Sequence, residues 1–217
     1  MNRREFLRGA LAATAASAIP APGATATEVS GENGSGGITP TERRRKRFVN
    51  VALQTHEGKE VRFYDDLIKG KTVLINFIYT RCGDGSCPVT TAYLARVQQL
   101  LGERVGRDIF MYSITLDPEH DTPRVLKNYA DAFRVKPGWL FLTGKKDDIE
   151  RLRRNLGFVN RDPVLDKKRS QHLGFLRFGI EPLERWGGCP AMTNPEAIAR
   201  YISWMEPKGE RPQDATP

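Results

Sequence analysis

The sequence is short of several features that would place it in a specialised class of protein. It has three cysteines in 217 residues, too few for a small scaffold held together by disulfides. Its apolar run from Gly9 to Ile19 is well short of the roughly 20 residues that a membrane-spanning helix needs. No internal repeat is visible. Apolar residues still make up 39% of the chain, so the sequence can build one ordinary globular core.

The positive charge is large but scattered. The net charge is +8, and part of the excess lies near the start, at Arg3, Arg4 and Arg8, with another part in the short run 43–47. There is no basic helix with interleaved aromatic residues and no nucleic-acid-binding motif. The sequence therefore predicts a solvated basic surface and no nucleic-acid partner.

The first 26 residues have the pattern of an export signal. Adjacent arginines followed by Phe6 and Leu7 resemble a twin-arginine signal, which carries folded cargo, and the alternative is an ordinary secretory leader. Ala24-Thr25-Ala26 is a plausible cleavage site. We therefore expect a protein of the periplasm or cell envelope that touches a membrane only through an uncleaved leader, if at all.

The rest of the chain divides into a linker, a domain and a tail. Residues 27–46 are predicted to be a flexible linker, because their first part is rich in Gly, Thr and Ser. Residues 47–206 are predicted to form one domain, and 207–217 a disordered tail.

The hydrophobic pattern of the domain alternates between strands and helices. A hairpin is predicted around the turn at His56 to Lys59, and the strongest strand is the apolar run 73–79. Further strands are predicted at 109–116, 139–142, 172–178 and near 186, and helices at 65–69, 88–101, 122–133, 147–156 and 194–204. This order predicts an α/β fold with helices on both faces of the sheet. In such sheets the chemistry gathers at the carboxyl ends of the strands.

Two cysteines lie at such an end, in the loop between strand 73–79 and the next helix. Cys82 and Cys87 flank a loop with two glycines, and Pro88 follows. A helix start favours negative charge, so it favours the thiolates that metal binding and disulfide exchange both require. The pair could therefore form a redox disulfide or hold a soft ion such as Cu(I), and an added imidazole would suit both copper oxidation states. A structural disulfide is the plainer alternative.

These residues resemble the SCO/SenC family, the copper-binding proteins that help to assemble the CuA centre of cytochrome c oxidase. The resemblance is carried by 79–82, the Cys87-Pro88 pair, the stretches 113–123 and 138–144, and a late histidine, His172. It covers about residues 48 to 205. It implies a thioredoxin-like fold, here with an N-terminal β-hairpin extension.

The resemblance also implies a ligand set and a partner. The copper ligands would be Cys82, Cys87 and His172, and the partner would be a copper acceptor such as an oxidase subunit, with a thiol reductant as a further candidate. Two departures from the family pattern stand out. Four residues separate the cysteines where the family usually has three, and Gln171 stands where the family usually has Asp.

Two functions compete on this evidence. The leading hypothesis is a copper chaperone of the cell envelope, which is a binding protein rather than an enzyme. The alternative is a thiol–disulfide oxidoreductase that reduces the cysteines of an acceptor through Cys82 and Cys87. Thioredoxin-like reductases carry a proline facing their cysteines, and Gln171-His172 takes that place here, which favours copper. A thiol peroxidase with Arg81 beside its cysteine is a third, weaker reading.

Three other candidate side chains are given structural roles. His56 and His120 are predicted to be surface residues, in a hairpin turn and a loop beside proline. Cys189 does not belong to the family pattern and is predicted to have a packing or solvent-exposed role rather than to join the site.

Overall fold

The computed structural model describes residues 39–168, 171 and 174–207. Its centre is one seven-stranded sheet with the order β2-β1-β5-β4-β3-β6-β7. The strands are β1 (Ala52–Thr55), β2 (Glu60–Arg62), β3 (Thr72–Ile78), β4 (Ile109–Thr115), β5 (Trp139–Gly144), β6 (Phe175–Ile180) and β7 (Arg185–Pro190). The strands β3, β4 and β5 run parallel, and β1, β6 and β7 extend the sheet in antiparallel pairs. This is the mixed sheet that the alternating pattern predicts.

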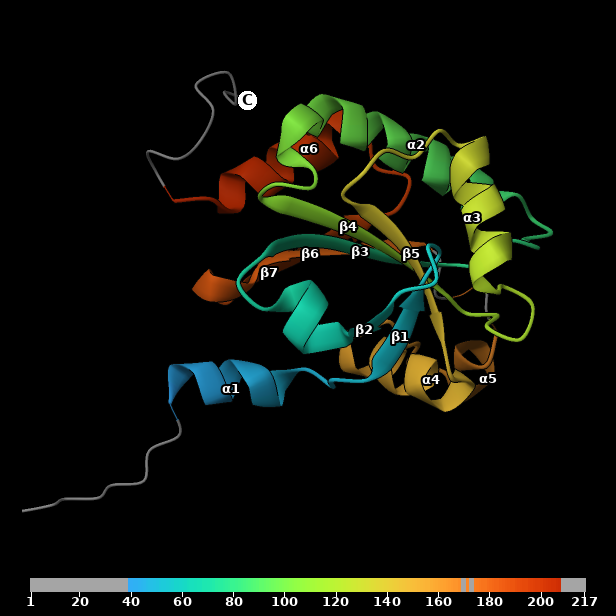
Figure 1. The fold of residues 1–217 in the computed structure, drawn as a ribbon, viewed down its shortest axis with the longest axis horizontal. Coiled ribbons are helices and arrows are strands. Elements are labelled where there is room, and N and C mark those ends of the chain that lie inside the picture. The colour runs from blue at the N-terminus through green and yellow to red at the C-terminus, as the bar shows by residue number, and fades with distance from the viewer. Residues whose placement is uncertain (1–38, 169–170, 172–173, 208–217) are drawn as a thin grey trace, which may run out of the picture. The chain divides into compact units, whose positions relative to one another are not determined.

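Helices cover both faces of the sheet (Figure 1). One face carries α2 (Ser86–Leu101), α3 (Pro123–Ala132) and α6 (Pro195–Met205), and the other carries α4 (Lys146–Asn155), α5 (Pro163–Asp166), the π-helix η1 (Phe63–Ile68) and α1 (Pro40–Arg47). Short 3-10 turns follow α2 at Gly102–Arg104 and β6 at Glu181–Leu183. Within the described residues no helix has the length and apolar content to cross a bilayer.

The core consists of two hydrophobic clusters, one on each face of the sheet. The cluster under α2, α3 and α6 contains Leu74 and Ile78, and the opposite cluster contains Ile75 and Phe77. Alternate residues of β3 therefore supply both clusters, which explains why this strand is apolar on both sides. A strand that is buried on both faces holds its carboxyl end rigidly, and the cysteine loop begins there.

The N-terminal hairpin extends the sheet at one edge. Leu53 of β1 lies opposite Val61 of β2, and on its other side opposite Gly144 of β5. The turn is made by Gly58, whose φ of 85° lies in the left-handed region that favours glycine. The predicted α/β fold with an N-terminal hairpin extension is confirmed.

One helix occupies part of the predicted linker. α1 begins at Pro40, where Thr39 and Glu42 form a reciprocal capping box, and it ends before Phe48. It buries none of its residues, so it lacks the apolar stripe by which helices are found in a sequence. The prediction of a flexible segment as far as residue 46 is therefore wrong for residues 40–46, whereas residues 27–38 lie outside the described part.

Candidate metal centre

The two cysteines of the loop lie at the junction of β3 and α2. β3 ends at Ile78, and α2 begins at Ser86 with Gly85 as its N-cap at a φ of 74°. The left-handed backbone at Gly85 turns the chain into the helix, a conformation that a side chain would strain. Cys87 therefore lies within the first turn of α2 and Cys82 in the loop before it.

Each sulfur accepts a hydrogen bond from the backbone of the loop. The N–H of Cys87 donates to Sγ of Cys82 at 3.4 Å, and the N–H of Tyr79 donates to Sγ of Cys87 at 3.5 Å. Donors aimed at sulfur stabilise the negative thiolate. Because one cysteine donates to the sulfur of the other, the loop already holds the two residues against each other.

The two thiols differ in exposure. Cys82 is partly exposed, whereas Cys87 is 1% exposed and packs into the core beneath α2. Burial raises the pKa of the Cys87 thiol well above its usual range. Cys82 is thus the sulfur that a partner or reagent reaches first. Both are free thiols in this structure.

Asp84 and Ser86 complete the surroundings of Cys82. The Cys82 thiol donates to Oδ1 of Asp84 at 2.9 Å, and the same oxygen accepts the N–H and the hydroxyl of Ser86 at 3.0 and 2.8 Å. The hydrogen bonds from Cys82 and Ser86 lower the pKa of Asp84 to about 2. An ionised carboxylate therefore stands beside the exposed sulfur at neutral pH. The sequence analysis missed this contact, although both residues lie between the two cysteines.

A buried carboxylate from the β4–α3 loop supports the chain just before Cys82. Asp121 is fully buried and accepts the N–H of Thr80 at 3.1 Å and the hydroxyls of Thr80 and Thr115, each at 2.5 Å. Nδ1 of His120 lies 3.0 Å from Oδ1 of Asp121, the oxygen that also accepts the hydroxyl of Thr80. These bonds fix the backbone two residues ahead of Cys82.

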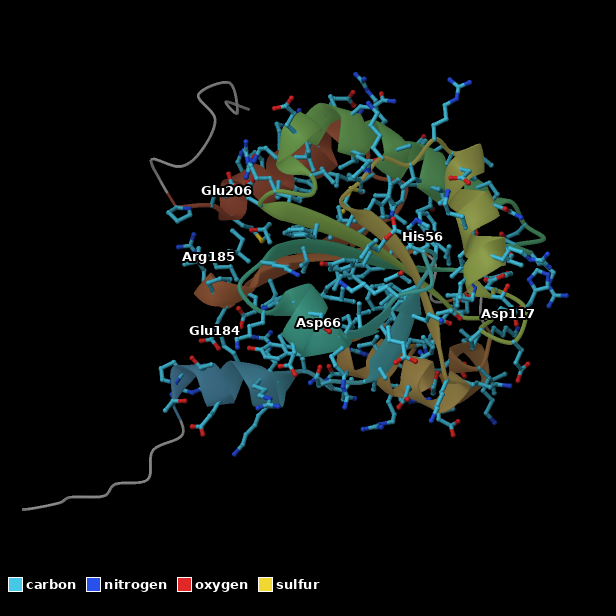
Figure 2. All side chains as sticks on the ribbon, viewed as in Figure 1. His56, Asp66, Asp117, Glu184, Arg185 and Glu206 are labelled. Carbon is cyan, nitrogen blue, oxygen red and sulfur yellow. The ribbon has the colours of Figure 1, made fainter. Side chains whose placement is uncertain are left out.

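A second contact joins the same two loops. The guanidinium of Arg81 donates to Oδ2 of Asp117 at 3.0 Å, and Asp117 is 3% exposed. Figure 2 shows Asp117 beyond the end of the sheet where the β4–α3 loop lies. The stretch 113–123, which contains Asp117, therefore supports the cysteine loop.

His172 lies outside the described residues, and the described residues nearest to it in the chain are Gln171 and Gly174. The N–H of Gln171 donates to the carbonyl of Lys168, and the carbonyl of Gly174 accepts the N–H of Ala191. In the ladder between β3 and β6, Ile75 lies opposite Arg177. Within the described part of the chain, no group of three or more His, Cys, Asp or Glu side chains is arranged to hold a metal.

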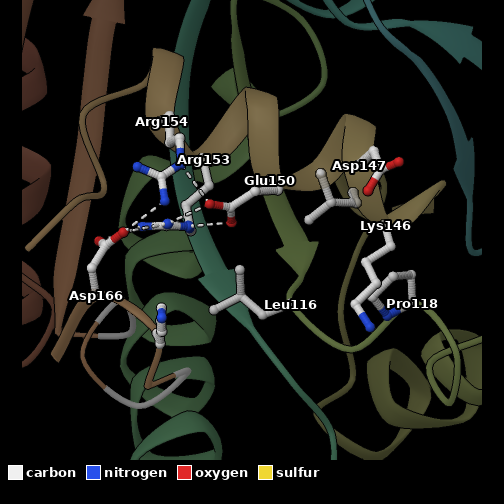
Figure 3. A pocket seen from close by; sticks show the side chains of 10 residues that line it. Leu116, Pro118, Lys146, Asp147, Glu150, Arg153, Arg154 and Asp166 are labelled. Carbon is white, nitrogen blue, oxygen red and sulfur yellow. Dashed lines mark hydrogen bonds and ion pairs between the residues drawn. The ribbon is translucent and has the colours of Figure 1, made fainter. Parts of the chain in front are cut away.

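A charged pocket lies between the Asp117 loop and the segment that leads to His172. It has a volume of about 380 Å³ and is lined by Leu116 and Pro118 on one side and by charged side chains of α4 and α5 on the other. Figure 3 shows the guanidinium of Arg153 between the carboxylates of Glu150 and Asp166. Nη2 of Arg153 lies 2.7 Å from Glu150 and 3.0 Å from Asp166. This network ties α5 to α4 a few residues before Gln171.

The structure corrects the interpretation of both other histidines as surface residues. His56 is partly buried, its Nδ1 accepts the N–H of Phe141 at 3.1 Å, and burial lowers its pKa. His120 is also partly buried and contacts Asp121. Cys189 is 6% exposed and packs in the same core cluster as Cys87, as its predicted packing role requires.

The family follows from a comparison of the chain with known proteins. The model of the SCO1/SenC family matches residues 42–174, more than half of the chain. The chain belongs to the SCO1/SenC family. The match includes both loop cysteines, the Asp117 to Asp121 segment and His172. A model of twin-arginine translocation signals matches residues 1–20, so the chain carries a signal for export to the cell envelope.

Similar proteins of the SCO1/SenC family include both sequences and solved structures. A SCO1 protein homolog of Bacillus subtilis is 36% identical over 100 residues, 45% of this chain and 50% of that protein. A SCO1/SenC family lipoprotein of Bacillus anthracis has a TM-score of 0.59 at 22% identity, over 73% of this chain and 94% of that one. Bradyrhizobium japonicum ScoI with copper bound has a TM-score of 0.55 at 24% identity, over 71% and 96%.

These similarities differ in what they establish. The two solved structures support the fold of this SCO1/SenC protein, because identity below 25% carries no residue-level argument. The chain spans about half the length of the sequence relatives that it matches. Activity, cargo and partners are therefore argued from the site itself.

Proposed function

We propose that this SCO1/SenC protein is a copper chaperone of the cell envelope, with Cys82, Cys87 and His172 as its copper ligands. The observation that carries the proposal is the mutual arrangement of the two loop cysteines, in which the N–H of Cys87 donates to Sγ of Cys82. Two thiolates held side by side at a helix start form a soft donor set that suits Cu(I). Zinc usually takes four protein ligands in structural sites, and the described residues supply no such group.

The register of the sheet supports His172 as the third ligand. The β3–β6 ladder ends at the Ile75–Arg177 pair, so Arg177, five residues after His172, lies opposite a residue three positions before the end of β3 at Ile78. Gly174, two residues after His172, is held by the hydrogen bond that its carbonyl accepts from the N–H of Ala191. An imidazole that joins two thiolates would make the site competent for Cu(II) as well.

The difference in exposure between Cys82 and Cys87 determines the side from which an acceptor can take the copper ion. Cys82 is partly exposed and Cys87 is buried, so an acceptor thiolate can attack the ion from the Cys82 side while Cys87 still holds it. Ion transfer by such ligand exchange keeps copper bound throughout. The acceptor is proposed to be a cysteine-containing copper site such as the CuA centre of cytochrome c oxidase.

Metal analysis tests the proposal directly. The full chain, fully reduced without oxygen, is loaded with Cu(I) in the presence of a competing chelator, and copper is measured per protein. We expect one copper per chain, lost in Cys82→Ser and Cys87→Ser and retained in Cys189→Ser, the matched control. Retention of copper by both loop variants, or its loss in the Cys189 variant, would place the ion elsewhere.

A thiol–disulfide oxidoreductase is the second candidate, and the same difference in exposure between Cys82 and Cys87 fits it as well. The Cys82 thiolate would attack an acceptor disulfide and release one acceptor thiol, and Cys87 would then attack Cys82 and release the second. The reaction moves two electrons and two protons and leaves the Cys82–Cys87 disulfide. A chain that reduces such a substrate but binds no copper when reduced would favour this reading over the chaperone.

A further inference from the structure

The helix α1 presents an unusual concentration of positive charge. Five consecutive cations, from Arg43 to Arg47, follow the single acid Glu42, whose carboxylate is engaged in the capping box with Thr39. Among the described residues, Arg43, Arg45 and Lys46 are exposed and have no acidic partner. The helix therefore has an outward face of uncompensated charge.

The inward side of α1 is fixed to the domain. Nε of Arg44 lies 3.0 Å from Oε1 of Glu181, an ion pair without an aligned hydrogen bond. Glu181 is 3% exposed, and its carboxylate also accepts the hydroxyl of Tyr64 and the N–H of Gly70. Arg47 lies over the rings of Phe48 and Trp186, at 5.8 Å from each. A surface helix held in this way keeps one orientation.

A further positive charge, on Arg177 of β6, lies near α1. Burial lowers the pKa of Arg177 on β6, and the positive charge of Arg47 lowers it further. Two guanidinium groups on α1 and β6 therefore repel each other, although Glu181 pairs with Arg44 of the same helix. An external anionic surface would relieve this repulsion.

The helix and the cysteine loop lie at opposite ends of the sheet. Glu181 directly follows β6, whose last residue, Ile180, is paired with Thr72 at the start of β3, whereas the cysteine loop follows Ile78 at its end. Seven residues of strand span about 20 Å. Figure 1 shows α1 at one end of the sheet, and Figure 2 places Asp117 at the end away from Glu184 and Arg185.

We propose that the outward face of α1, formed by Arg43, Arg45 and Lys46, binds the anionic phospholipid surface of the membrane across which the chain is exported. The exported chain meets phospholipid headgroups there. The model of twin-arginine signals matches residues 1–20, and residues 21–39 can span at most about 65 Å, which bounds the distance of α1 from the bilayer while the leader is held there. Each Lys or Arg close to an anionic lipid surface adds to the electrostatic attraction. Bound in this way, the domain turns the cysteine loop away from the lipid. This inference does not depend on copper binding.

Vesicle binding of three full-length proteins tests the proposal. They are the wild type, a triple variant of α1 (Arg43→Gln, Arg45→Gln, Lys46→Gln) and a control triple variant (Arg124→Gln, Lys136→Gln, Arg200→Gln), whose exposed cations lie on or beside α3 and α6. Both variants lose three charges and share the same leader. Vesicles of phosphatidylcholine with 30% phosphatidylglycerol are compared with pure phosphatidylcholine.

We expect the α1 variant to bind the anionic vesicles at least tenfold more weakly than the wild type, and the control to bind within about twofold of it. High salt should remove the difference between wild type and variant, because ions screen the attraction. Equal binding by all three proteins, or equal loss in both variants, overturns the proposal. The proposal is also overturned if the α1 variant loses affinity for polyuridylate while its vesicle binding is unchanged, because this face would then bind nucleic acid.

The same vesicles test the orientation. A membrane-impermeant thiol reagent should modify Cys82 at the same rate with and without anionic vesicles. A tenfold slower reaction on vesicles would mean that the cysteine loop faces the lipid, and would contradict the proposed orientation.

Discussion

Thr80 donates two hydrogen bonds to the buried carboxylate of Asp121, one from its backbone N–H at 3.1 Å and one from its hydroxyl at 2.5 Å. The two residues are separated by 41 positions in the sequence. Their contact joins the loop that carries Cys82 to the loop that follows β4. The carboxylate therefore acts on the cysteines through the backbone that precedes them.

Replacing Asp121 by Asn should loosen the cysteine loop. The substitution replaces one carboxylate oxygen by an NH2 group, which points at the donors of Thr80 or Thr115. One buried donor therefore loses its acceptor, at a cost of about 2–3 kcal/mol. Thermal or urea unfolding measures this cost. The specific readout is the alkylation rate of Cys82 in the folded state, which we expect to rise several-fold. Asp131→Asn, at an exposed site on α3, serves as the control. A destabilised variant with unchanged Cys82 reactivity would mean that Asp121 is purely structural.

The three cysteines should react in a fixed order. Cys82 is partly exposed, whereas Cys87 and Cys189 are buried and burial raises the pKa of both. We expect iodoacetamide to label Cys82 at least tenfold faster than the other two in the folded protein. Mild oxidation should link Cys82 to Cys87, as peptide mass mapping will show. A link from Cys189 to either loop cysteine would refute the assignment of the pair.

Gly138 should tolerate no side chain. Its φ is 92°, and an added Cβ would lie 2.3 Å from the backbone nitrogen of Gly106, a distance that forces the backbone apart. We expect Gly138→Ala to cost about 3 kcal/mol or more. Gly58→Ala is the control, since its φ is 85° but nothing lies within 4 Å, and it should cost about 1–2 kcal/mol. Equal urea midpoints for the two variants would exclude the close approach as the cause.

Asp166 should make stability depend on acid pH. Hydrogen bonds from Arg153 and from the backbone of Asn160 hold its pKa well below the usual range. A depressed pKa stabilises the fold fully above the unfolded value of about 3.9, and this contribution is lost as the pH falls below it toward the folded pKa. The free energy of unfolding, measured in urea between pH 6 and pH 2.5, should therefore fall less steeply with decreasing pH in Asp166→Asn than in the wild type. The control Asp147→Asn, at an exposed position, should show the same pH dependence as the wild type. The same pH dependence in all three proteins would contradict the proposed role of Asp166.

Much of the fold can be predicted from the sequence because its signals are local. The apolar run of β3, the Gly and Pro residues around the cysteine loop and the Thr122-Pro123 start of α3 each depend on a few adjacent residues. These signals suffice for the sheet, for most helices and for the position of the Cys82–Cys87 pair.

The remaining features depend on partners that are distant in the sequence. α1 was missed because its stability comes from a capping box and from the contact of Arg44 with Glu181, and it has no hydrophobic stripe. His56 was assigned to the surface because its acceptor role toward Phe141 joins residues that only the fold brings together. The carboxylate of Asp121 was missed as a support for the site for the same reason.

The most direct test of the copper chaperone is His172→Ala, because it separates the two candidate functions. Cu(II) affinity and the Cys82–Cys87 reduction potential are both measured on the full chain. If His172 is a copper ligand, Cu(II) binding should weaken by at least a hundredfold, Cu(I) binding should weaken less because two thiolates can hold that ion, and the reduction potential should stay nearly unchanged. Unchanged affinity for both copper ions would contradict the proposed ligand set, and a wild-type protein that binds neither ion when fully reduced would refute the chaperone.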